Sequence, residues 1–137
     1  MIEPLKSNIN FGTKSILKTL YEDGNLDLTY GIYGGQLTRK RNKPNSDTLE
    51  HIQPHDKHGK ASLENLALAT AENNNKRSNK PLSSVFNKEN FIKYCEQFID
   101  IKVPYESGVF DGNTYIEGIT RTVARELKKE GKLDMLM

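Results

Sequence analysis

A set of polar residues in the middle of the sequence could together hydrolyse a phosphodiester bond. That reaction needs a base to activate water, a cation to neutralise charge on the phosphoryl group and the leaving oxygen, and a scaffold that fixes both. Glu50 offers a carboxylate oxygen and Asn74 an amide oxygen, both of which suit Mg²⁺. Histidine is largely free base near neutral pH, because its unperturbed pKa is about 6.5. We therefore expect His51 to be the base, and Asn65 to tie the backbone of the intervening loop and so orient His51.

The segment that carries these residues is predicted to fold as strand, long loop, strand and helix. Neighbouring residues on a strand point to opposite faces, so Glu50 and His51 can face one site only if the strand ends or twists there. Pro54 is consistent with such an end, because proline cannot continue a central strand. The predicted elements are an extended run at 47–52, a polar loop at 53–64, a short strand at 65–70 and a helix at 71–80 that Thr70 caps and Pro81 follows.

The remaining sequence predicts helices on both sides of this segment and a β-hairpin before it. Residues 26–42 have β-favouring side chains around a Gly34-Gly35 pair that tolerates the positive φ angles of a tight turn. An amphipathic helix is expected within 13–24, and two more are expected after Asn87 and Thr114, which can cap them. We therefore predict an α+β fold, with a single domain over residues 1–137, a core at 28–81 and a C-terminal helical extension at 82–137.

Composition narrows the class of protein. No run approaches the roughly 18 apolar residues of a membrane helix, and the N-terminus lacks the basic-then-apolar pattern of a signal peptide. We therefore expect a cytoplasmic protein without a membrane partner. The single Cys95 excludes an internal disulfide and a zinc site made from several thiolates, so we expect no structural zinc.

Basic residues are concentrated in the middle of the chain. Residues 39–80 carry nine Lys or Arg and five Asp or Glu, whereas the whole chain has a net charge of +2. A basic middle is a plausible footprint for a polyanion, because neutralising phosphates releases counterions. The residues predicted to contact DNA are Arg39, Lys40, Arg41, Lys57, Lys76 and Arg77.

The run LEHIQPHDKHGKASLENLALATAENNNK, residues 49–76, resembles the HNH endonucleases of the ββα-metal class, as found in phages and homing endonucleases. In that family an acidic residue and a histidine end the first strand, an asparagine closes a long loop, and a histidine or asparagine lies on the next helix. These positions are matched by Glu50, His51, Asn65 and Asn74. The spacing from His51 to Asn65 is fourteen residues and that from Asn65 to Asn74 is nine, and both are typical of the family.

The resemblance implies roles for the four residues and a substrate. Glu50 and Asn74 would hold a divalent metal, most simply Mg²⁺ with Mn²⁺ or Ni²⁺ as alternatives, His51 would be the general base, and Asn65 would brace the loop. The substrate would be double-stranded DNA, cut to 5′-phosphate and 3′-hydroxyl ends, with RNA as an alternative because such a motif contacts phosphates. A monomer would nick one strand, and a homodimer would make double-strand breaks.

Two departures from the family pattern motivate a different class of function. Many HNH proteins frame the motif with a zinc knuckle of two Cys-x-x-Cys pairs, but here Gly31 and Gly34 replace the first pair, and Thr70 and Asn73 the second. If the knuckle keeps its shape, Tyr33, Leu37 and their neighbours must hold it by packing. Glu50 also stands where aspartate is commoner. The alternative is therefore a catalytically weak or inactive HNH-fold protein that binds nucleic acid or inhibits a nucleic-acid enzyme.

Overall fold

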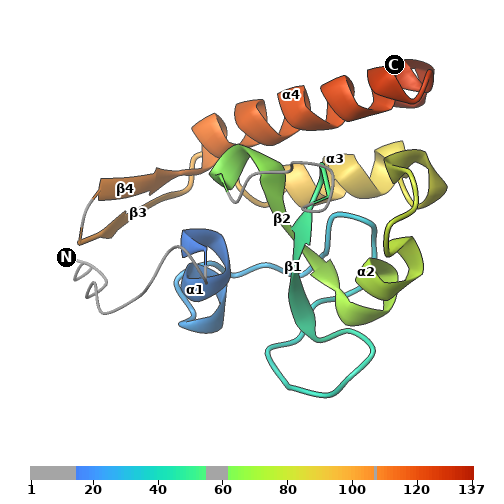
Figure 1. Ribbon diagram of the computed structural model, residues 1–137. Coiled ribbons are helices and arrows are strands. Elements are labelled where there is room, and N and C mark those ends of the chain that lie inside the picture. Colours follow the sequence, from blue (N-terminus) through green and yellow to red (C-terminus); the bar gives the residue numbers. More distant parts are fainter. Residues whose placement is uncertain (1–14, 55–61, 107) are drawn as a thin grey trace.

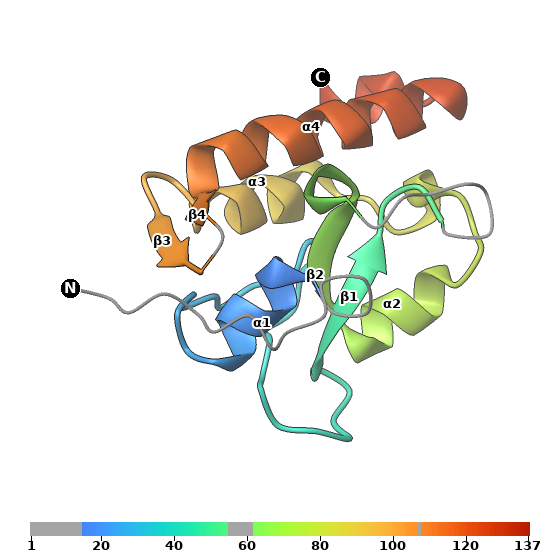
Figure 2. The ribbon, with the colours of Figure 1, turned by 60° about the vertical axis from the view of Figure 1, so that its left-hand side comes forward.

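The computed structural model of the chain consists of helices packed around small antiparallel sheets (Figure 1). It describes residues 15–54, 62–106 and 108–137, and it confirms the expected α+β class for them. In both Figure 1 and Figure 2 the longest helix, close to the C-terminus, lies along one side of the other elements. In this described part of the chain, no helix is long and apolar enough to cross a membrane.

The centre of the molecule is a pair of antiparallel strands followed directly by a helix. These are β1 (Asp47–His51), β2 (Leu66–Thr70) and α2 (Ala71–Arg77). In the register of the two strands, Glu50 lies opposite Ala67 and His51 opposite Leu66. The predicted order of strand, loop, strand and helix is therefore confirmed.

β2 is buried along its whole length, which explains why its sequence is a continuous apolar run rather than an alternating one. β1 covers one of its edges. On the other edge, the backbone amide of Leu68 donates to the Tyr94 hydroxyl over 3.1 Å, and the Tyr115 hydroxyl donates to the Leu66 carbonyl over 2.7 Å. The amide of Ile32 donates to the Leu68 carbonyl over 2.9 Å, so both edges of this strand have partners.

Side-chain caps fix where the helices begin. Thr70 accepts a hydrogen bond from the amide of Asn73 at the start of α2, as predicted. Ser15 caps the N-terminal helix α1 (Ile16–Glu22), and Gly24, with a φ of 83°, lies just after its end. The sequence pattern offers Thr13 as the cap of this helix, and that residue lies outside the described residues; the cap in the structure is Ser15.

The two C-terminal helices are present, but one begins earlier than its sequence pattern indicated. Asn87 caps α3 (Lys88–Glu96), as expected. α4 (Gly112–Lys129) is capped by Asp111, whose carboxylate accepts from the amide of Thr114. Thr114 was therefore wrong as the cap, because the helix already begins at Gly112 and the amide of Thr114 is itself one of the first-turn amides that need an acceptor.

α3 and α4 meet through aromatic side chains that form much of the core. The Tyr94 ring of α3 and the Phe98 ring just after this helix lie 6.4 Å and 4.8 Å from the Tyr115 ring of α4, measured between centroids. Cys95 is half-buried beside them, and burial raises the pKa of its thiol to about 12. We therefore interpret Cys95 as a packing residue at the edge of the core.

A second hairpin between these helices was not predicted. β3 (Lys102–Tyr105) and β4 (Gly108–Asp111) pair antiparallel within the range expected to be a helical extension. Prediction of helices alone over 82–137 was therefore wrong. Each strand has four residues, too few to show a clear apolar alternation, and Pro104 argues against a strand unless the strand lies at an edge.

The hairpin expected at 26–42 is instead a compact turn. Its ladder contacts are isolated bridges, Tyr30 with Gln36 and Thr38 with Ser46. Gly34 and Gly35 take the expected positive φ angles of 96° and 81°. The strands do not form, because the amide of Gly31 bonds within the turn, to the Gly35 carbonyl, and that of Ile32 bonds to β2.

Candidate active site

Glu50, His51 and Asn74 line one cavity of about 280 Å³ where β1 ends beside α2. Figure 2 shows this end of β1 and the neighbouring helix α2. β1 stops at His51, which meets the requirement that adjacent strand residues reach a common site. The other described residues that line the cavity are Leu49, Pro54, Ser78 and Asn79.

Glu50 is held by two donors that are far from it in sequence. Its side chain is buried, and the Tyr33 hydroxyl donates to Oε2 over 2.5 Å. Nη1 of Arg77 donates to the same Oε2 over 3.1 Å. Burial raises the pKa of Tyr33 well above its usual value, and the Glu50 charge raises it further, so Tyr33 stays a neutral donor.

Arg77 was predicted to contact DNA, and its position in the structure contradicts this prediction. It is only 1% exposed, so its guanidinium does not lie on the surface where it could bind a phosphate. Nη1 also donates to the His51 carbonyl over 3.1 Å, and Nε donates to the Lys80 carbonyl over 3.2 Å. Burial acts to lower the pKa of Arg77, but the Tyr33 and Glu50 oxygens outweigh it and raise the pKa, so the side chain stays a cation.

The side chain of Asn74 is oriented by β1. Its Nδ2 donates to the Thr48 hydroxyl over 3.0 Å and to the Leu49 carbonyl over 3.2 Å. The amide nitrogen is therefore committed to the strand, and the amide oxygen is the atom with which Asn74 could bind a cation.

Asn65 ties the two ends of the loop between the strands. Its Oδ1 accepts from the Gln53 amide over 2.8 Å, and its Nδ2 donates to the Gln53 carbonyl over 3.1 Å. Its own carbonyl accepts from the Ile52 amide over 2.9 Å. These bonds fix the backbone directly after His51, as a bracing role requires. Residues 55–61 of the loop lie outside the described residues.

The other predicted DNA contacts lie in different surroundings. Lys40 and Lys76 are exposed. Arg39 is exposed, but it donates to the carbonyls of Tyr21 and Leu26 and lies over the Tyr21 ring. Arg41 pairs with the buried Asp47 carboxylate. Lys57 lies outside the described residues.

Hydrogen bonds hold the turn around Gly34, where the sequence resemblance would place half of a zinc knuckle. Nδ2 of Asn73 donates to the carbonyls of Gly34 and Tyr33, over 3.1 Å and 3.4 Å. Nδ2 of Asn90, from α3, donates to the Tyr33 carbonyl over 3.2 Å. A Cβ at Gly34 would lie 2.6 Å from Asn90 Nδ2, so the turn and α3 are in close contact. In addition to the packing expected from Tyr33 and Leu37, the side chains of Asn73 and Asn90 hold the turn by hydrogen bonds. We call these two side chains the asparagine clasp.

We predict that Asn73→Ala lowers the free energy of unfolding by about 1–2 kcal/mol, because the Gly34 carbonyl loses its described donor and the Tyr33 carbonyl keeps only Asn90. The matched control is Asn75→Ala on the same helix, since Asn75 is exposed; we expect it to change stability by less than about 0.5 kcal/mol. Urea denaturation of both variants measures the difference. Equal stabilities would show that the asparagine clasp does not hold the turn.

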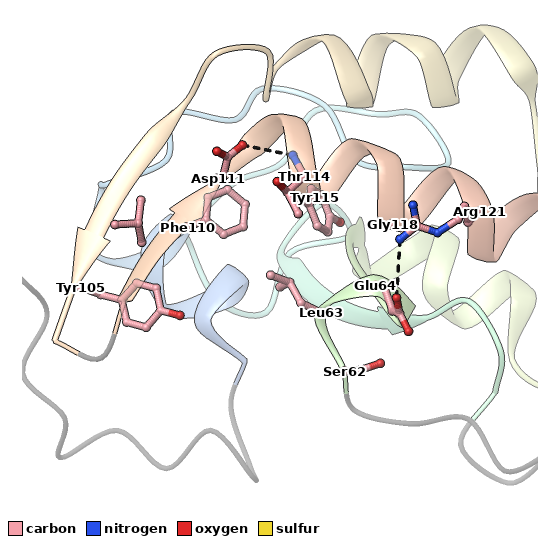
Figure 3. Close-up of a pocket in the computed structure, with 11 residues that line it drawn as sticks. Ser62, Leu63, Glu64, Tyr105, Phe110, Asp111, Thr114, Tyr115, Gly118 and Arg121 are labelled. Atoms are coloured by element: carbon pink, nitrogen blue, oxygen red, sulfur yellow. Dashed lines mark hydrogen bonds and ion pairs between the residues drawn. The ribbon is translucent and has the colours of Figure 1, made fainter.

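A second cavity, of about 350 Å³, is lined by none of the predicted site residues. Figure 3 shows it between the 3₁₀ helix η2 (Leu63–Asn65), β4 and α4, with the aromatic side chains of Tyr105, Phe110 and Tyr115 around it. Glu64 and Arg121 form an exposed ion pair of 4.0 Å at its edge. Such a pair contributes little to stability.

The sequence pointed to Glu50, His51 and Asn74, which line the first cavity, but not to the role of the residues behind them. Tyr33 and Arg77 lie 17 and 27 residues from Glu50. No local pattern connects such positions, and a basic residue in the last turn of a helix ordinarily indicates a solvated helix end.

No protein-family model, curated protein or solved structure matches the chain significantly.

Proposed function

We propose that this chain is a metal-dependent endonuclease of the HNH type that hydrolyses phosphodiester bonds in DNA. The observation that carries the proposal is that Glu50, His51 and Asn74 line a single cavity. These residues come from the end of one strand and from the helix that follows its partner strand, the arrangement that the sequence resemblance implies. The resemblance and this juxtaposition together support the proposal.

The donors available in the cavity fit a hard divalent cation. The hydrogen bonds that the described residues make to Glu50 all fall on Oε2, which leaves Oε1 for a cation. Asn74 uses its amide nitrogen in bonds to β1, which leaves its amide oxygen. Carboxylate and amide oxygens are the ligands that Mg²⁺ prefers, and the remaining positions would be filled by water and phosphate. When bound, the cation would neutralise charge on the phosphoryl oxygens and on the leaving oxygen.

His51 would be the general base in this mechanism. It would accept a proton from a water molecule as that water attacks the phosphorus. The bond from phosphorus to the 3′ oxygen would break, and the leaving oxygen would take up a proton. The products would be a 5′-phosphate and a 3′-hydroxyl. Asn65 would act as a positioning residue, because it fixes the backbone that follows His51.

One observation favours the alternative of a non-catalytic module that binds nucleic acid. The carboxylate of Glu50 is already paired with a buried cation, Arg77, which weakens its attraction for a metal. The rest of the proposed site keeps side chains that are competent for catalysis.

The experiment that separates these functions is an incubation of supercoiled plasmid with the protein in Mg²⁺, Mn²⁺ or Ni²⁺, and in chelator. We expect conversion to open circles in at least one cation, with no conversion in chelator, and ends that a ligase can reseal directly. A failure to cut in every cation, together with a gel shift of the same plasmid, would support the binding module instead. A parallel incubation with duplex RNA compares the two nucleic acids.

A further inference from the structure

The described wall of the cavity carries a single acidic side chain, Glu50, and no lysine or arginine. Within the described ranges, no group of three or more His, Cys, Asp or Glu side chains lies together as a metal cage would require. The cavity therefore differs from a metal site in which several carboxylates attract the cation. Its affinity for a cation depends heavily on the state of one carboxylate.

That carboxylate is paired with Arg77, which lies behind the cavity wall. A buried arginine is costly, because its guanidinium must replace all the hydrogen bonds it made to water. Nη1 has three described partners, the Glu50 carboxylate, the Tyr33 hydroxyl and the His51 carbonyl. Nη2 is also buried, and it has no hydrogen-bond partner among the described residues. Such an unsatisfied buried donor calls for an explanation in terms of function or strain.

The formal charges of Glu50 and Arg77 cancel. A divalent cation that entered the cavity alone would meet a carboxylate whose charge is already compensated, inside a protein where charge repulsion is poorly screened. A phosphate brings negative charge of its own and would complete the charge balance. Because coupling between two ligands is reciprocal, each would then bind more tightly in the presence of the other.

We propose that Arg77 is a positioning residue that makes cation binding at Glu50 and Asn74 depend on a nucleic-acid phosphate. The proposal rests on the function proposed above, since it concerns the same site. Arg77 does not line the cavity, so it would touch neither substrate nor cation. It acts by neutralising Glu50 and by holding the Glu50 carboxylate and the His51 carbonyl with the same nitrogen.

The test is a titration of the protein with Mn²⁺, followed by electron paramagnetic resonance, with and without a short DNA duplex. Glu50→Gln with the same duplex gives the background from Mn²⁺ on DNA. We expect the duplex to tighten Mn²⁺ binding by about tenfold or more, the size of effect typical of coupled sites. Equal affinity with and without DNA would overturn this proposal and leave the cation site standing. An absence of binding above background in both would overturn the cation site, and this proposal with it.

A matched pair of variants tests the role of Arg77 itself. Arg77→Gln removes the charge and is expected to tighten Mn²⁺ binding without DNA by about tenfold, because the Coulomb repulsion is lost. Arg77→Lys keeps the charge and should retain the dependence on DNA. The proposal would be overturned if Arg77→Gln bound Mn²⁺ without DNA as the wild type does, or if the two variants bound Mn²⁺ without DNA equally well. Circular dichroism monitors folding, and if Arg77→Gln does not fold, loss of the DNA dependence in Arg77→Lys would overturn it.

Discussion

Replacing His51 by alanine is expected to lower the rate of plasmid nicking by a factor of about 10²–10⁴, the usual contribution of a general base. The imidazole is the side chain in the described cavity wall best suited to accept a proton from water near neutral pH. The measurement is the initial rate of conversion of supercoiled to open-circular plasmid, with protein in excess and with the cation that best supports cutting by the wild type.

The control for this substitution is Asn79→Ala, because Asn79 lines the same cavity without a proposed chemical role. Its rate should stay within about threefold of the wild type, as expected for a surface position that makes no contact in the transition state. The His51→Ala variant should also bind Mn²⁺ as the wild type does, because His51 is not a proposed ligand. Metal-dependent nicking at an undiminished rate in His51→Ala would remove His51 from the mechanism.

Replacing Arg77 by methionine is expected to lower the free energy of unfolding by about 3–5 kcal/mol, the usual cost of removing one partner of a buried ion pair. Methionine fills much of the same volume, so the loss reports on charge and hydrogen bonds rather than on a cavity. The substitution leaves the buried Glu50 carboxylate with the Tyr33 hydroxyl as its remaining described donor. It also removes donors from the carbonyls of His51 and Lys80. Urea denaturation near neutral pH measures the change.

A double variant separates the ion pair from other effects of the Arg77 substitution. Glu50→Gln combined with Arg77→Met removes both charges, and the new amide can still accept from Tyr33. Removing both partners of a buried pair is often neutral, so the double variant should recover much of the stability that Arg77→Met loses. A double variant as unstable as the sum of the single ones would show that the pair is not coupled.

Local patterns predicted the parts of the fold whose signals lie close together in sequence. The apolar run of β2 and the Thr70 cap are each set by a few neighbouring residues. The same holds for Asn65, because the loop it closes begins and ends at residues that the strand pairing places side by side. The predicted end of the helix at residue 80 was wrong, because α2 ends at Arg77, where Ser78 takes a positive φ of 47°.

Features that depend on distant contacts escaped prediction from sequence. The turn around Gly34 does not form a ladder, because Ile32 bonds to β2 and Asn90 reaches the turn from α3. The sequence likewise shows a basic residue at position 77 but not that its side chain folds inward to Glu50. The contradiction of Arg77 as a DNA contact arose in this way, since burial is a property of the whole fold.

The asparagine clasp on the Gly34 turn also determines which conditions the fold tolerates. In a knuckle built on cysteines, the same turn would loosen when thiols are oxidised or when zinc is scarce. Here the turn is held by amide groups of Asn73 and Asn90, and the single cysteine of the chain lies elsewhere, in α3. We therefore expect the stability of this turn not to depend on zinc supply or on thiol oxidation, which unfolding measured with added zinc or oxidant would check. A chelator would then remove the cation proposed to bind in the cavity without unfolding the nearby turn.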